Sequence, residues 1–247
     1  MRKTVKILGV KIDKVTEKEA LSRAKGFLKK EGVSKIYTPN PEIIMTAKED
    51  SEFMEILNNA DLCTADGIGV VYGAKILGTP VPQRVAGFDL TCKILEYLKD
   101  TEDGVFLFGA KPGVADIAKQ KLVEKYPGLR VVGTNDGYFT EEDIPMIIGK
   151  INESGARLLL VCLGAKKQEK WINDNQDKMT TVRLCMGVGG TLDVFAGNVK
   201  RAPKIFIKLN LEWLYRLLKQ PSRIGRFAAL PKFIVEVFKS KKGMKKK

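Results

Sequence analysis

The residues best suited to chemistry lie in the stretch 60–70, where Asp66 stands between two apolar runs. Residues 62–63 are typical of a short buried strand, and the apolar residues at 68–77 suit a helix. Because ligands of an open α/β sheet bind at the carboxyl ends of its strands, Asp66 is placed where a catalytic carboxylate would be useful. Aspartate is also a preferred helix N-cap, so this stretch alone leaves a catalytic and a capping role equally open.

Arginines are the candidates for holding a diphosphate group. The chain has no Asp-x-Asp pair, so an enzyme acting on a nucleotide sugar would have to neutralise the departing diphosphate in another way. The arginine fork can donate two hydrogen bonds to phosphate oxygens. The candidates are one residue in a loop with two prolines and three in the C-terminal tail: Arg84, Arg216, Arg223 and Arg226. Each of them, taken singly, is also typical of a solvated basic surface.

Polar side chains follow two other predicted strands. Thr38 and Asn40 come after an apolar strand, although Asn40 before Pro41 is also a common start of a helix. Gln168 and Glu169 follow a strand and a glycine turn, and they are equally typical of the first turn of a helix.

Glycines after strands offer backbone N–H groups near helix starts, an arrangement that suits phosphates. They are Gly109, Gly137, Gly189 and Gly190. Plain turn glycines explain any single one of them at least as well. No strict G-x-G-x-x-G follows a strand, because Leu192 occupies the position of the third glycine, and no G-x-x-x-x-G-K-[ST] is present. These absences disfavour a Rossmann dehydrogenase and a P-loop enzyme.

Composition excludes further classes. The chain has no histidine, which removes histidine bases, triads and metal ligands. Its four cysteines show no C-x-x-C spacing and lie in apolar contexts, so we expect reduced, buried thiols in the cytoplasm. Residues 1–4 lead directly into an expected strand and no run of 18 apolar residues occurs, so we expect neither a signal peptide nor a spanning helix.

The expected elements alternate between strands and helices, which predicts an α/β fold: a Rossmann-like, mostly parallel sheet with helices on both faces. Strands are expected at 5–8, 10–12, 34–38, 62–63, 105–108, 129–132, 157–163 and 182–186. Helices are expected from the capping box at 16–19 towards 30, at 42–48, 51–59, 68–77 and 88–99, and after the later strands. We place a catalytic domain at 1–197 and an appendage at 198–247.

The appendage is strongly basic. Of the formal net charge of +14, nearly all arises after residue 199, where fifteen lysines and arginines face two acids. The pattern predicts an amphipathic helix over 204–219 and shorter helical pieces around Pro231. Such a segment favours an anionic membrane surface, with about 1 kcal/mol from each basic residue near the lipid. Packing of the apolar stripe against the catalytic domain is the alternative, and exposed apolar surface would favour self-association away from a membrane.

Seven motifs in order resemble the WecG/TagA/CpsF family of glycosyltransferases. Single motifs are weak, but the ordered set is specific and spans about 5–226. The motifs are Thr38-Pro-Asn40, Ala65-Asp-Gly-Ile-Gly69, Arg84-Val-Ala-Gly-Phe-Asp89, Gly164-Ala-Lys-Lys-Gln-Glu-Lys-Trp171, Gly187-Val-Gly-Gly-Thr-Leu-Asp-Val-Phe-Ala-Gly197, Arg201-Ala-Pro203 and Leu211-Glu-Trp-Leu-Tyr-Arg216. Lys166 is a departure, because the family usually has proline there.

The resemblance implies an inverting transferase that needs neither metal nor cofactor. Its closest branch implies transfer of N-acetylmannosamine from a UDP donor to the 4-hydroxyl of GlcNAc on undecaprenyl diphosphate, in wall teichoic acid synthesis. Asp66 would be the general base. The remaining roles would be sugar and diphosphate contacts (Thr38, Asn40, Arg84, Gln168), nucleoside binding (Asp193 with the glycines), and closure over the diphosphate (Arg216, Arg223, Arg226).

Two alternatives stay open at the level of the sequence. Another donor, such as UDP-N-acetylmannosaminuronic acid, would need only one more cation in the pocket. A basic nucleic-acid-binding protein would explain the tail, but the tail lacks a recognised motif and its aromatics lie on an apolar helical face. We therefore expect a cytoplasmic protein, peripheral on the inner face of the cell membrane, without a nucleic-acid partner.

Overall fold

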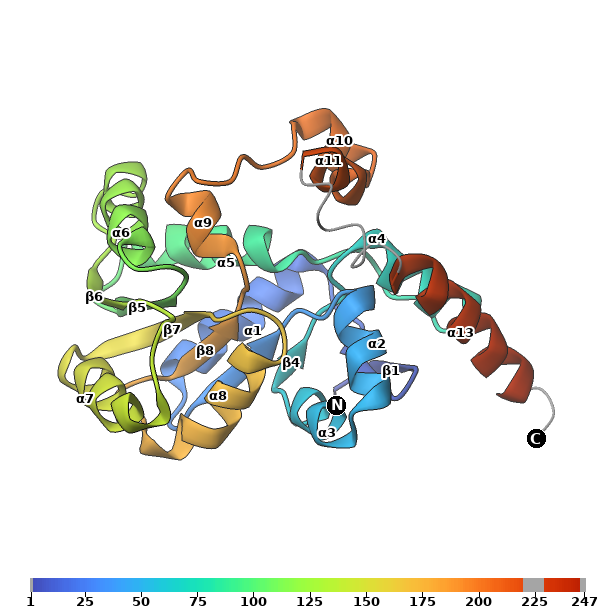
Figure 1. The fold of residues 1–247 in the computed structure, drawn as a ribbon, viewed down its shortest axis with the longest axis horizontal. Coiled ribbons are helices and arrows are strands. Elements are labelled where there is room, and N and C mark those ends of the chain that lie inside the picture. The colour runs from blue at the N-terminus through green and yellow to red at the C-terminus, as the bar shows by residue number, and fades with distance from the viewer. Residues whose placement is uncertain (1, 220–228, 245–247) are drawn as a thin grey trace.

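The structure is a computed structural model of residues 1–247, and it describes residues 2–219 and 229–244 (Figure 1). Its centre is a six-stranded, all-parallel sheet in the order β4-β3-β8-β7-β5-β6. The strands are β3 Ser34–Tyr37, β4 Leu62–Cys63, β5 Gly104–Gly109, β6 Val131–Asn135, β7 Ala156–Cys162 and β8 Leu184–Gly187. The central strands are buried along nearly their whole length, as continuous apolar runs in a parallel sheet require.

Helices cover both faces of the sheet. They are α1 Glu17–Lys29, α2 Pro41–Glu49, α3 Ser51–Asn58, α4 Ile68–Ile76, α5 Gly87–Leu98, α6 Val114–Lys125, α7 Ile144–Glu153, α8 Lys167–Asn175 and α9 Thr191–Phe195, with 3-10 turns at Glu141–Asp143 and Gln176–Lys178. Alternate residues of β5 feed two separate cores: Phe106 and Phe108 pack on the side of α2, α3, α7 and α8, whereas Val105 and Leu107 pack on the side of α1, α5 and α6. The predicted fold class is confirmed.

Side-chain caps explain where several helices begin. Thr16 and Glu19 form the predicted capping box of α1. Asn40 caps α2, with Pro41 in the first turn, and Asp50 caps α3. Some strand bounds differ from the prediction. Strand β8 starts two residues later than expected, at Leu184. Strand β6 starts at Val131, because Leu129 still belongs to the turn after α6, where its N–H donates to the Tyr126 carbonyl.

An antiparallel hairpin precedes the main sheet and supports β4. Strands β1 Thr4–Ile7 and β2 Val10–Asp13 form a sheet of their own. The Asp13 carboxylate is fully buried, pairs with Arg2 and Arg23 at 2.7 and 2.9 Å, and accepts a hydrogen bond from the Cys63 N–H at 2.8 Å. The hairpin therefore holds in place the strand that leads to Asp66.

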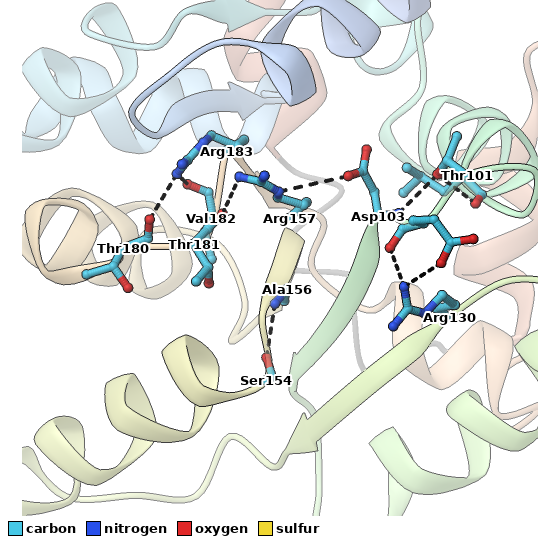
Figure 2. Close-up of polar contacts among 12 residues, drawn as sticks. Thr101, Asp103, Arg130, Ser154, Ala156, Arg157, Thr180, Thr181, Val182 and Arg183 are labelled. Atoms are coloured by element: carbon cyan, nitrogen blue, oxygen red, sulfur yellow. Dashed lines mark hydrogen bonds and ion pairs between the residues drawn. The ribbon is translucent and has the colours of Figure 1, made fainter.

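Arginines tie together the loops at the amino ends of the strands (Figure 2). Arg183 donates to the Thr180 carbonyl at 3.0 Å, and Arg157 reaches the Thr181 carbonyl and the Asp103 carboxylate. Arg130 binds Glu102 at 2.8 Å. These arginines have structural partners at the edge opposite to the candidate site.

The tail differs from the prediction in its helices. The helix expected over 204–219 is wrong as one element, because α10 Lys204–Lys208 and α11 Glu212–Lys219 are separated at Asn210, whose φ is +59°. Asparagine tolerates this left-handed conformation better than most residues. The pieces expected around Pro231 lie outside the described residues up to 228; from Ala229 on the chain forms one helix, α13 Ala229–Met244, with the proline in its first turn, where no backbone donor is needed.

Helix α13 packs against α2 and α4 (Figure 1). Phe233 and Val237 are fully buried there, and Glu236 pairs with Lys48 of α2. The end of the tail therefore packs on the catalytic domain through α13, whereas the packing alternative stated for the stripe over 204–219 stays a prediction. None of the helices in the described ranges is both long and apolar enough to span a membrane. The domain boundary at residues 197 and 198 stays a prediction.

Candidate active site

Asp66 lies at the carboxyl edge of the sheet, where the chain leaves β4. Its N–H donates to the Pro39 carbonyl at 3.2 Å, which joins the loops after β4 and β3. Its Oδ2 accepts from the Gly87 N–H at 3.2 Å, at the first residue of α5. The capping alternative is wrong for the following helix, because the N-cap position of α4 is Gly67, with φ +86°, and no side chain caps this helix. The Asp66 carboxylate instead faces the N-terminus of α5, which attracts negative charge.

Thr38 and Asn40 lie in the adjacent loop after β3. Thr38 is buried against Gly87: a Cβ on that glycine would come within 2.5 Å of Thr38 Oγ1, so only glycine fits. The Asn40 Oδ1 accepts from the Ile43 N–H at 3.0 Å, so its oxygen is committed to starting α2.

Arg84 reaches the same edge from the loop before α5, and acids surround it. It lies 3.6 Å from Asp89 and 3.4 Å from Glu212 of α11, and its side chain is only 16% exposed. Asp89 also pairs with Arg201 at 2.6 Å, and the Arg201 guanidinium stacks over Phe88 at 4.7 Å. These ion pairs connect the appendage to the site through Arg84.

Gln168 and Glu169 occupy the first turn of α8, beside the end of β8. Both are buried. The Gln168 Nε2 donates to Glu169 at 2.8 Å, and its Oε1 accepts from the Gly189 N–H at 2.9 Å. The prediction of a helix first turn is confirmed.

The candidate glycines shape the turns at this edge. A Cβ on Gly109, with φ +122°, would collide with the Cys162 carbonyl. The Gly137 N–H already donates to the Ala110 carbonyl at 2.8 Å, and that of Gly189 donates to Gln168. Gly190 precedes the five-residue helix α9. Gly109 therefore lets the backbone at the end of β5 approach the Cys162 carbonyl closely. The N–H groups of Gly137 and Gly189 have partners in the protein.

The remaining predicted residues belong to α9 and the tail. Asp193 is half-buried in α9, and its carbonyl accepts from the Val199 N–H at 3.2 Å. Arg216 is part of α11, but its side chain lies outside the described residues, as do Arg223 and Arg226 entirely.

Lys166 adopts a conformation that proline cannot. Its φ is +70°, whereas a proline ring fixes φ near −65°. Its N–H also donates to Glu169 at 2.7 Å, a bond that proline lacks the donor to make. The turn before α8 is therefore specific to a non-proline residue here.

Sequence reasoning did not identify the acids around Arg84. Glu212 is one of only two acids in the basic tail, which was the available signal. Across the described part of the chain, no three histidine, cysteine, aspartate or glutamate side chains are grouped as a metal site would need. A cavity of about 310 Å³ is lined by Phe88, Lys121, Leu122, Lys125, Val194 and Phe195.

The chain belongs to the glycosyl transferase WecG/TagA/CpsF family, whose sequence pattern matches residues 5–247. It is accordingly a glycosyltransferase, and the family expected from the ordered motifs is confirmed.

Curated relatives are similar over most of their length. A protein of Staphylococcus aureus (strain MRSA252) is 35% identical over 244 residues, covering 98% of this chain and 95% of the relative. Proteins of Bacillus spizizenii (strain W23) and Bacillus subtilis (strain 168) are 36% and 35% identical, each covering 85% of this chain and 81% of the relative. All three are named N-acetylglucosaminyldiphosphoundecaprenol N-acetyl-beta-D-mannosaminyltransferase.

Proposed function

We propose that this glycosyltransferase moves N-acetylmannosamine from UDP-N-acetylmannosamine to the 4-hydroxyl of GlcNAc on undecaprenyl diphosphate, a step of wall teichoic acid synthesis. The names of the relatives support the sugar and the acceptor. The position of Asp66 carries the proposal, since it stands at the carboxyl edge of the sheet beside Thr38, Gly87 and Arg84.

The proposed reaction is a single displacement with inversion. Asp66 takes the proton of the acceptor's 4-hydroxyl, the oxygen forms a bond to the anomeric carbon, and the bond from that carbon to the diphosphate breaks as UDP leaves. A positioned base typically contributes about 10²- to 10⁴-fold in rate. The hydrogen bond from Gly87 fixes the carboxylate, and the tie to Pro39 fixes its backbone.

Arginine replaces metal in this proposal. Arg84 is held within the site by Asp89 and Glu212, and a diphosphate could compete for its guanidinium. Arg216, Arg223 and Arg226 are proposed to close over the same group. The absence of an Asp-x-Asp pair and of histidine from the sequence supports a reaction without metal or cofactor.

The proposed site of action is the inner membrane surface. The acceptor in the relatives' name carries an undecaprenyl chain, and the basic tail supplies attraction to anionic lipid. Binding to anionic vesicles and to DNA at matched salt separates a peripheral membrane enzyme from a nucleic-acid-binding protein. Preference for DNA would contradict the membrane role.

UDP release with purified protein, UDP-N-acetylmannosamine and a soluble lipid-linked GlcNAc analogue, in EDTA, tests the function. We expect turnover that falls at least about 100-fold in Asp66→Asn. Asp174→Asn, at an exposed helix position where the carboxylate contacts Lys170 and Asn173, is the matched control and should keep wild-type turnover.

Other outcomes assign the protein differently. Turnover with UDP-N-acetylmannosaminuronic acid alone would keep the mechanism and change the donor. Loss of turnover in EDTA would contradict metal independence. No turnover with any UDP-sugar would overturn the proposed reaction and favour the binding-protein alternative.

A further inference from the structure

Glu169 is a buried carboxylate that the proposed reaction does not use. It is only 1% exposed, and no lysine or arginine nitrogen in the described ranges lies within 4.0 Å of its carboxylate oxygens. Two donors satisfy it instead. Its Oε2 accepts from the Lys166 N–H at 2.7 Å, and its Oε1 accepts from Gln168 Nε2 at 2.8 Å. Burying a carboxylate without a cation is costly, so such a residue needs a compensating role.

The two neighbours of the Gln168 amide determine its orientation. A carboxylate can only accept hydrogen bonds, so the amide nitrogen must face Glu169. A backbone N–H can only donate, so the amide oxygen must face Gly189. Both contacts require the same orientation, and reversing the amide would break both.

The far end of this hydrogen-bond chain holds the turn of residues 187–190, called here the glycine turn. Gly189 has φ +53°, and its N–H donates to the Gln168 oxygen at 2.9 Å. Gly187 packs on the same side chain, since a Cβ there would lie 3.0 Å from Gln168 Nε2. Gln168 thus joins the start of α8 to the end of β8.

We propose that Glu169 is a positioning residue: its carboxylate fixes the Gln168 amide, and that amide fixes the glycine turn for binding of the donor's nucleoside diphosphate. The inference rests on the proposed function in taking a UDP-sugar as donor. Glu169 does not touch the donor in this arrangement and acts through Gln168.

A simple capping role is the competing explanation, and the chain contains a matched control for it. Glu19 accepts from the Thr16 N–H at 2.7 Å at the start of α1, as Glu169 accepts from Lys166 at the start of α8. Glu19 caps a helix at the surface and has no contact with Gln168 or the glycine turn. If capping were the whole role of Glu169, the substitutions Glu169→Gln and Glu19→Gln would both lower stability, and neither would change the affinity for UDP.

Calorimetric titration with UDP of the full-length wild type and both variants tests the inference. Glu169→Gln replaces one of the two accepting carboxylate oxygens with an amide nitrogen, which is a donor. Gln168 Nε2 or the Lys166 N–H then faces a donor, so we expect about tenfold weaker UDP binding. Glu19→Gln should bind UDP as the wild type does. Equal UDP affinity of all three proteins would overturn the inference.

A double-mutant cycle tests whether Glu169 acts through Gln168. Gln168→Met removes the amide at similar volume and leaves Glu169 capping α8, so it should weaken UDP binding by a similar factor. Adding Glu169→Gln to it should then change the affinity less than about twofold. Fully additive effects would contradict action through Gln168. If Glu169→Gln fails to fold, Gln168→Met still tests whether the Gln168 amide fixes the glycine turn, and unchanged UDP affinity of Gln168→Met would overturn the inference.

Hydrogen exchange of the glycine turn separates this inference from the proposed function. Wild-type protein that fails to bind UDP would overturn the proposed donor, yet exchange in residues 187–190 still reports on the chain of hydrogen bonds. We expect about tenfold faster exchange in Glu169→Gln and no change in Glu19→Gln. Unchanged exchange in Glu169→Gln would overturn the positioning role whatever the donor is.

Discussion

The environment of Asp66 is made by three segments that meet at one carboxylate. The loop after β3 accepts from its backbone, the start of α5 donates to its side chain, and the hairpin fixes β4 before it. These three contacts restrict the position of the Asp66 carboxylate, and proton transfer requires the base to be positioned accurately. Changes to the supporting residues should therefore lower the rate without removing the carboxylate.

Gly87→Ala should lower turnover although Gly87 is not one of the reacting groups. The new Cβ would lie 2.5 Å from Thr38 Oγ1, so either Thr38 or the start of α5 must move and carry the Asp66 contact with it. We expect turnover to fall about 100-fold and stability to fall by about 1–3 kcal/mol. Gly149→Ala in α7, with no atom within 4 Å of the added Cβ, is the control and should retain activity. A fully active Gly87→Ala enzyme would contradict this account.

The two capping glutamates should respond oppositely to pH. Burial raises the pKa of Glu169 above its ordinary value of 4.5, against opposing hydrogen bonds from Gln168 and the backbone, whereas hydrogen bonds from Thr16 lower the pKa of Glu19. Native Glu169 binds its proton more tightly than in the unfolded chain, so its contribution to stability falls as pH rises above about 4.5. The contribution of Glu19 is present above that pH and is lost as pH falls below it.

Denaturant unfolding at several pH values checks this difference. The stability of the wild type relative to Glu169→Gln should decrease from pH 4.5 towards 7, and relative to Glu19→Gln it should increase from pH 3 to 5. Slopes of the same sign for both pairs would rule out the burial of Glu169 as the cause.

The sequence predicted those site residues that directly follow a strand, and it missed contacts between residues far apart in the chain. Strand ends bring Asp66 and Thr38 to one edge, since the position of a residue after a strand is visible in the sequence. Glu212 was missed as a partner of Arg84, because it lies 128 positions away in the sequence and only the folded tail brings it near. The N–H partner of the Asp66 carboxylate, Gly87, lies 21 positions away in the sequence, so the contact that replaces the capping role was not visible there either.

At the scale of elements, α13 is held against α2 and α4 by one buried apolar face. Phe233 is fully buried between α4 and the hairpin, while Phe238 on the same helix is 50% exposed. Phe233→Ala should cost about 3–5 kcal/mol locally, and hydrogen exchange of α13 should rise steeply. Phe238→Ala is the matched control and should leave exchange unchanged. Equal exchange in both variants would show that α13 is not held through Phe233.

Periodicity predicted the elements of the catalytic region closely, because α1, α2 and α3 carry side-chain caps and the central strands are continuous apolar runs. Periodicity failed where a single residue determines the end or the interruption of an element. Asn210 interrupts the tail helix in a backbone conformation that periodicity does not detect, and Leu129 is an apolar residue buried in a turn. The docking of α13 also depends on small residues, Gly69 and Gly73, in a distant helix.

For the whole molecule, the tail should be dispensable for folding and required for turnover. A chain ending at Asn198 keeps the six-stranded sheet and α1 to α9 but loses Glu212 and the cover of Phe233. We expect circular dichroism of a folded protein, a lower Tm, and nearly absent UDP release. Full turnover of the shortened chain would contradict the role of the tail. An unfolded product would show that α13 is part of the fold.

The contact between α13 and α4 links the outermost helix of the protein to its candidate base. Leu230 and Phe233 face Gly69 and Gly73, and α4 starts two residues after Asp66. A surface that favours the docked position of α13 would favour the same arrangement of α4, and by reciprocity a substrate that favours this arrangement would strengthen attachment to the surface. One coupling free energy would then link binding to the surface and binding of the substrate. An enzyme with its acceptor bound would dissociate from the surface more slowly than an enzyme without acceptor.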